Sequence, residues 1–113
     1  MLTTSIILFA AAAIFGLLIL IPLLQNKQTP KPAVFIHGAL AATALIILII
    51  FTINTAGDSP IISIVLFIIA ALGGFTLAYR DLILKKPGPK GLAVIHAVAA
   101  VTGFLILLFF AFE

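Results

Sequence analysis

The sequence contains no cysteine, and only 8% of its 113 residues are charged. Without cysteine there can be no disulfide framework, iron–sulfur cluster or thiolate zinc site. Only three residues are acidic, and the sequence contains no carboxylate pair, which argues against a carboxylate metal site and against hydrolysis by a pair of carboxylates. There is also no nucleophile–base arrangement and no phosphate-binding loop. These absences exclude the common hydrolytic and thiolate-metal enzyme classes.

Hydrophobic residues, in contrast, make up 65% of the chain, against about 45–50% in an ordinary soluble domain. A membrane-spanning helix needs about 20 consecutive apolar residues. The charged residues leave four uncharged runs of that length, at 1–26, 32–57, 59–79 and 91–112. The sequence therefore predicts an all-α, integral membrane four-helix bundle that forms one domain over residues 1–113. We expect its helices at 2–24, 33–53, 60–84 and 91–112.

The distribution of the basic residues predicts the topology. All six lie near the connections after the first and third predicted helices, at Lys27, Lys31, Arg80, Lys85, Lys86 and Lys90. By the positive-inside rule this side faces the cytoplasm, so we expect both termini outside, in a bacterial inner membrane. The pI near 9.7 does not indicate nucleic acid, because the cations form no continuous stripe. Ser59 and Pro60 predict an N-cap followed by the first helical residue.

An internal repeat carries the only two histidines. The segment 30–38, which contains His37, reappears in outline at 89–97, which contains His96, with an offset of 59 residues. The sequence thus predicts a duplicated helical hairpin, with one copy in 1–53 and the other in 60–113. Because each copy crosses the membrane twice, we expect a pseudo-twofold axis along the membrane normal. Both histidines should then lie at the same depth near the cytoplasmic side.

Small residues share a helical face with each histidine. Positions i, i+4 and i+7 lie on one face of a helix, and here they read His37-Ala41-Ala44 and His96-Ala100-Gly103. Small residues in membrane helices face neighbouring helices or flat ligands rather than lipid. We therefore expect both histidines to point inward, toward each other. Gly16 and the pair Gly73-Gly74 supply similar small faces on the first and third helices.

Two interpretations of the histidines remain open. In the first, His37 and His96 are the two axial ligands of one haem b, and Ala41, Ala100 and Gly103 leave room for its flat ring. In the second, both histidines are inherited through duplication and only hydrogen-bond across helices. The protein would then be a cofactor-free structural or assembly subunit of a larger membrane complex.

The two motif copies, Lys31 to His37 and Lys90 to His96, resemble those of membrane b-type cytochromes. In those proteins a four-helix bundle holds haem between histidines on facing helices. The resemblance implies one non-covalent haem b and electron transfer with a quinone or a redox protein, rather than a stand-alone enzyme. Larger diheme families carry four ligand histidines in two layers, so the resemblance does not extend to a relay across the whole membrane.

Basic residues are candidates to bind the haem propionates. Arg80 is expected about five residues inside the third helix, roughly level with the histidines, and a guanidinium pairs bidentately with carboxylates. We therefore place Arg80 first and Lys31 and Lys90 second. The alternative is that Arg80 pairs with the neighbouring Asp81 or extends to the lipid headgroups.

Overall fold

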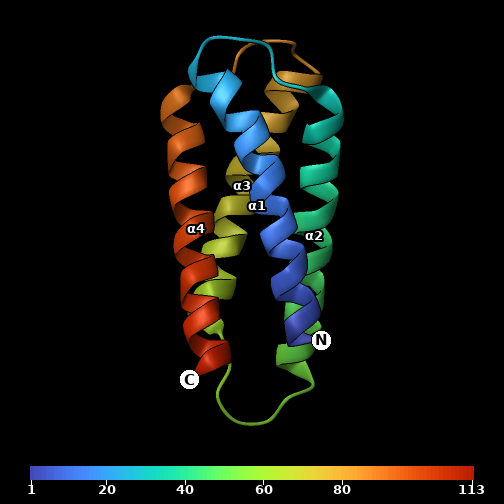
Figure 1. Cartoon of the computed structure of the whole chain (residues 1–113), viewed down its shortest axis with the longest axis vertical. Coiled ribbons are helices and arrows are strands. Elements are labelled where there is room, and N and C mark those ends of the chain that lie inside the picture. Colours follow the sequence, from blue (N-terminus) through green and yellow to red (C-terminus); the bar gives the residue numbers. More distant parts are fainter.

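A computed structural model describes all 113 residues, and it contains four helices and no strand (Figure 1). The helices are α1 (Leu2–Leu24), α2 (Lys31–Ile53), α3 (Ile61–Leu82) and α4 (Lys90–Phe112). Each is long and apolar enough to cross a membrane, and the 45 Å length of the bundle matches the roughly 40–45 Å of a bilayer with its headgroups. The prediction of an all-α, integral membrane four-helix bundle is confirmed.

Helix α1 has the predicted bounds, whereas the starts of α2 and α4 and both ends of α3 differ from the predicted ones by one or two residues. Helices α2 and α4 begin at lysines, because a proline just before each helix serves as its N-cap. Helix α3 begins at Ile61 with Pro60 as its N-cap and without a side-chain cap, so the predicted cap by Ser59 is wrong. The same helix ends at Leu82, two residues early, because the chain reverses through a left-handed conformation at Lys85 (φ 53°).

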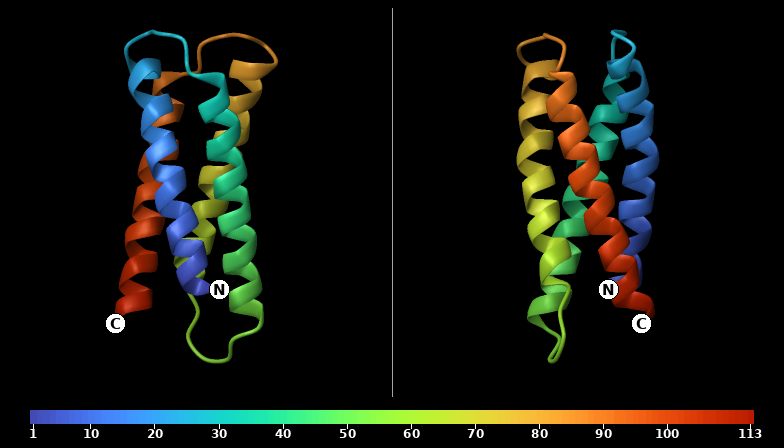
Figure 2. Two further views of the ribbon diagram at one scale, coloured as in Figure 1. Left: turned by 45° about the vertical axis from the view of Figure 1, so that its right-hand side comes forward. Right: turned by 90° about the vertical axis from the view of Figure 1, so that its left-hand side faces the viewer.

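The helices are arranged as two hairpins. Helix α1 packs mainly on α2, and α3 packs mainly on α4, while α1–α4 and α2–α3 make the smaller contacts between hairpins. Helices α2 and α4 are therefore diagonal, as are α1 and α3. The connections 25–30 and 83–89 lie together at one end, which we call the basic end, and both termini lie at the opposite end with loop 54–60 (Figures 1 and 2).

The packed core lies in the half of the bundle away from the basic end. Only 14 residues are buried, and most large hydrophobic side chains face outward, as expected where lipid is the solvent. The centre of the core is a pair of stacked rings, Phe9 of α1 and Phe67 of α3, whose centroids are 4.0 Å apart. Leu48 and Leu107 are fully buried beside this pair. The core thus joins the two hairpins across the α1–α3 diagonal.

Candidate functional site: a histidine pair within the bundle

Each histidine is held by a hydrogen bond to the other helix of its own hairpin. Nδ1 of His37 lies 2.7 Å from the carbonyl oxygen of Ala12, and Nδ1 of His96 lies 2.6 Å from that of Ala70. A carbonyl oxygen can only accept, so each Nδ1 carries a proton and donates it. In a neutral imidazole this places a free lone pair on Nε2. Neither Nε2 has a hydrogen-bond partner in the protein.

The two rings lie close together although their helices are diagonal. The centroids of His37 and His96 are 6.1 Å apart, and their planes cross at 81°. Both side chains are half-buried. Each histidine is the seventh residue of its helix, which places it about 9 Å from the helix start at 1.5 Å per residue. The structure therefore brings the two histidines together in one layer, close to the basic end.

Glycines bring the backbones of α1 and α3 against the histidine rings. A Cβ added to Gly16 would lie 3.2 Å from Cε1 of His37, and one added to Gly74 would lie 3.0 Å from Cε1 of His96. Gly73 faces the Cβ atom of His96 at 3.6 Å by the same construction. Any side chain at Gly16 or Gly74 would displace the ring, so the position of each imidazole depends on a missing Cβ.

The other small residues on the histidine faces have two different environments. Ala41 and Ala100, one turn beyond the histidines, are half-buried. Further along, Ala44 is fully buried and its carbonyl accepts a hydrogen bond from the Ser5 hydroxyl at 2.9 Å. A Cβ at Gly103 would lie 3.3 Å from the Phe67 ring. Ala41 and Ala100 thus lie nearest the histidine layer, whereas Ala44 and Gly103 serve helix packing.

A second polar cluster joins the hairpins at the basic end. Nζ of Lys31 lies 2.6 Å from Oδ1 of Asp81, and the Thr29 hydroxyl donates to Oδ2 of Asp81, also at 2.6 Å. Lys31 further donates to Thr29 at 2.9 Å. The bonds to Asp81 are the only hydrogen bonds between side chains of different hairpins. Asp81 therefore pairs with Lys31, and the structure has no Arg80–Asp81 ion pair.

Arg80 lies nearer the basic end than the sequence suggested. The residues of α3 that meet His96 are Ala70 and Gly74, and Arg80 follows Gly74 by six residues, or about 9 Å along the helix. The expectation that Arg80 is level with the histidines is wrong, because α3 ends at Leu82 and places Arg80 in its last turn. Lys90, the first residue of α4, is exposed and has no side-chain partner.

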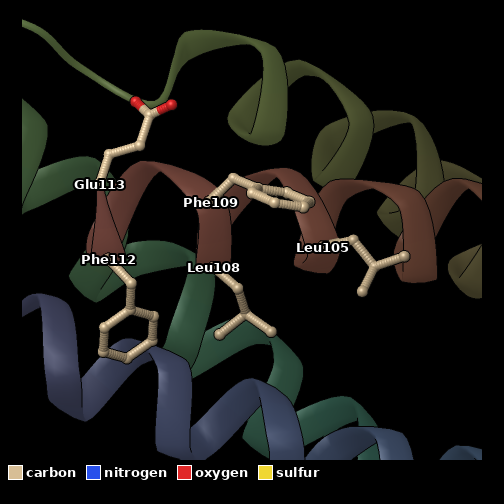
Figure 3. Close-up of a pocket in the computed structure, with 5 residues that line it drawn as sticks. All are labelled: Leu105, Leu108, Phe109, Phe112 and Glu113. Carbon is tan, nitrogen blue, oxygen red and sulfur yellow. The ribbon is translucent and has the colours of Figure 1, made fainter.

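Two hollows on the surface of α4 do not involve the histidines. One is lined by Ala97, Val98, Val101 and Thr102. The other lies at the C-terminal end of α4, where apolar side chains and Glu113 surround it (Figure 3). The lining is almost wholly apolar, as expected for a lipid-facing surface. There is also no cluster of three or more His, Cys, Asp or Glu side chains that could hold a metal ion alone.

Sequence reasoning missed the partners of the histidines, although the repeat contains a signal for them. Ala12 and Ala70, the two acceptors, are separated by 58 residues. The same offset separates the stacked Phe9 and Phe67. Alignment of the first helices of the two halves at this offset pairs Ala12 with Ala70, but it does not indicate that their carbonyls accept hydrogen bonds from the histidines.

The fold and the site define a class: an integral membrane four-helix bundle with a pair of histidines inside it. Comparison of the chain with protein-family models, curated proteins and solved structures finds no match. Its function therefore has to be argued from the chemistry of the histidine layer.

Proposed function

We propose that the protein is a membrane b-type cytochrome in which His37 and His96 are the axial ligands of one non-covalent haem b. The observation that carries this proposal is the matched pair of Nδ1–H···O=C hydrogen bonds. Histidines that bind a metal almost always donate their other ring N–H to a carbonyl or a carboxylate, which fixes the tautomer and orients the ring. Both imidazoles here have that partner and leave Nε2 available.

The separation of the rings supports the same assignment. Two imidazoles on opposite sides of one metal ion have their centres about 6 Å apart, because each metal–nitrogen bond is about 2 Å long and each nitrogen lies about 1 Å from its ring centre. The observed separation is 6.1 Å. The crossing angle of 81° is compatible with this, since each imidazole can rotate about its metal–nitrogen bond. The donor set therefore fits a haem iron.

The residues around the rings would hold and orient the group. The carbonyls of Ala12 and Ala70 would fix the ligand tautomer, and Gly16 and Gly74 would keep the rings against α1 and α3. A haem with two imidazole ligands supplies reversible one-electron transfer. Two imidazole ligands would leave no position on the iron for a substrate. This favours an electron carrier that exchanges electrons with a quinone or a redox protein over a stand-alone enzyme.

The proposal includes an origin and an orientation. The bundle is interpreted as a duplicated hairpin with a pseudo-twofold axis along the membrane normal, because equivalent residues make equivalent hydrogen bonds to His37 and His96. The positive-inside rule places the basic end in the cytoplasm, so the haem would lie near the cytoplasmic face of a bacterial inner membrane. Electron exchange is then expected on that side.

A second candidate is a cofactor-free structural or assembly subunit of a larger membrane complex. One observation favours it: the hydrogen bonds of His37 and His96 already connect the two helices within each hairpin. Bonds of this kind are worth about 0.6 kcal/mol on average in membrane proteins. In this case the histidines act only in packing.

Absorption spectroscopy separates the two candidates. The protein is produced with haem supplied, purified in detergent and reduced. We expect a sharp α band in the wild type and none in His37→Asn/His96→Asn. Asparagine is a suitable replacement because its side-chain amide nitrogen takes the place of Nδ1 and can still donate to the carbonyls of Ala12 and Ala70, so packing is disturbed less than by alanine.

Thr43→Val provides the matched control, since the Thr43 hydroxyl bonds only to its own helix, at the carbonyl of Ala39. This variant should keep the α band. A colourless wild type that retains its helical circular dichroism would contradict the cytochrome proposal, and so would a band that survives in the double variant.

A further inference from the structure

The basic end carries more positive charge than the protein neutralises. All six cations are at or beside the two connections of this end, whereas Asp58 and Glu113 lie at the opposite end (Figure 1). Asp81 is the one carboxylate near these cations, and it already binds Lys31 and Thr29. Every other cation at this end therefore requires an anion from outside the chain, or water.

Arg80 differs from the other cations because part of its charged group is buried. Its Nε atom is shielded from solvent and has no hydrogen-bond partner. A buried donor on a charged group without an acceptor is costly. The outer nitrogens of the guanidinium are not buried in this way and make no hydrogen bond within the protein, so they are the atoms that an anion from outside can reach.

The chain folds the backbone of Lys86 beside that of Arg80. The amide N–H of Lys86 donates to the carbonyl oxygen of Arg80 at 3.0 Å, which turns the connection 83–89 back toward the last turn of α3. Lys85 and Lys86 are both exposed in this connection. Arg80 thus lies in the last turn of a membrane helix, and the connection that carries two exposed lysines returns to this turn, where lipid headgroups are expected to begin.

We propose that Arg80, assisted by Lys86, binds the phosphate of an anionic phospholipid at the basic end. A guanidinium offers two parallel N–H donors to phosphate oxygens, whereas a lysine ammonium acts as a point charge. Basic pockets near membrane helix ends on the cytoplasmic side are recognised sites for anionic headgroups. The site uses neither His37 nor His96, and it adds a specific lipid to the proposed function.

The test measures retention of phosphatidylglycerol against phosphatidylcholine by haem-free protein in native mass spectrometry. Arg80→Gln is compared with Lys27→Gln, which removes the same charge from an exposed, unpaired lysine in the other connection. For Lys27→Gln we expect the retention of phosphatidylglycerol to fall about fivefold at most, as for loss of any cation near an anionic surface. For Arg80→Gln we expect about a thirtyfold loss, because a partly buried charge pair is broken. Arg80→Lys should restore part of the affinity.

Several results would overturn the proposal. Equal losses in Arg80→Gln and Lys27→Gln would reduce the effect to general attraction between the basic end and anionic lipid. Displacement of the lipid by an equal concentration of inorganic phosphate would show that the lipid is not the specific ligand.

Haem propionate is the competing occupant of Arg80, and a second titration addresses it. Haem dimethyl ester lacks the free propionate carboxylates. If Arg80→Gln weakens binding of haem but not of this ester, and leaves the retention of phosphatidylglycerol unchanged, then Arg80 binds a propionate and the lipid proposal is wrong. If the protein binds no haem at all, the cytochrome proposal fails while the lipid measurement keeps its meaning.

Discussion

Substitution of Gly74 by alanine tests whether the missing Cβ sets the position of His96. The new Cβ would lie 3.0 Å from Cε1 of His96, whereas carbon atoms pack best at about 3.5–4.0 Å. The ring must therefore move by a few tenths of an ångström. This movement lengthens the 2.6 Å hydrogen bond from Nδ1 to Ala70 toward the usual limit of about 3.2 Å.

The expected cost follows from these two effects. Overpacking of this size costs about 1–3 kcal/mol, and a weakened interhelical hydrogen bond costs about 0.6 kcal/mol. Alanine also gains about 1 kcal/mol in helix propensity over glycine. Gly38→Ala is the matched control, because nothing lies within 4 Å of its added Cβ and only the propensity gain applies. We expect Gly74→Ala to be about 2–3 kcal/mol less stable than Gly38→Ala.

Gly16→Ala should fall between the two, since its Cβ would meet His37 at 3.2 Å. Stability can be measured by unfolding in mixed detergent micelles, with energy transfer between dyes on single cysteines introduced into connections 25–30 and 83–89. The chain has no cysteine of its own, so both labels are specific. Equal stabilities of Gly74→Ala and Gly38→Ala would refute the reasoning, because the ring would then move without cost.

Three further outcomes follow from the structure and can be measured in the same assay. Ser5→Ala should cost about 0.6–1.7 kcal/mol of stability, because the Ser5 hydroxyl donates to a carbonyl of α2. Ser63→Ala should be neutral or stabilising, because the buried Ser63 hydroxyl has no partner. A larger loss for Ser63→Ala than for Ser5→Ala would contradict these hydrogen-bond assignments. A double-mutant cycle of Asp81→Asn and Lys31→Met should give a coupling free energy of about 0.5–1 kcal/mol, and this coupling should shrink in high salt because the lysine is 44% exposed. Additive effects of the two substitutions would show that the ion pair contributes nothing to stability. Lys85→Gly should stabilise the protein by up to about 1 kcal/mol, because it relieves a positive φ of 53°, and a loss of stability would count against this backbone conformation.

The membrane architecture was predictable because it depends on composition along the chain. Four apolar runs of sufficient length, separated by charged or proline-containing segments, leave few alternatives to four spanning helices. The helix ends were predicted less well for local reasons. Proline is tolerated in the first turn of a helix, so α2 begins at Lys31 rather than after the proline that follows it. The end of α3 depends on the left-handed backbone conformation of Lys85. The conformational preferences of lysine do not predict this conformation.

The contacts between hairpins were the least predictable part of the site. The sequence places Arg80 beside Asp81, so pairing between neighbours was the natural expectation. The structure instead pairs Asp81 with Lys31 of the other hairpin. The residues that meet at the basic end depend on how far α3 is shifted along α2. The apolar surfaces of these helices carry no pattern that determines this shift. The inward direction of the histidines could be argued, because it depends only on spacing within one helix.

The depth of the histidine layer determines how strongly the membrane potential can act on it. His37 and His96 lie about 9 Å inside helices that cross a hydrocarbon core of about 30 Å, and the stacked rings of Phe9 and Phe67 fill the bundle beyond them. A unit charge brought to this layer from the basic end would cross only about a third of the field. A potential of 100 mV would therefore change its free energy by about 0.7 kcal/mol, against about 2.3 kcal/mol for a complete crossing. A charge-moving step at this layer would respond to voltage about a third as strongly as a complete crossing, and an electron that arrived and left on the same side would do no net work against the membrane potential.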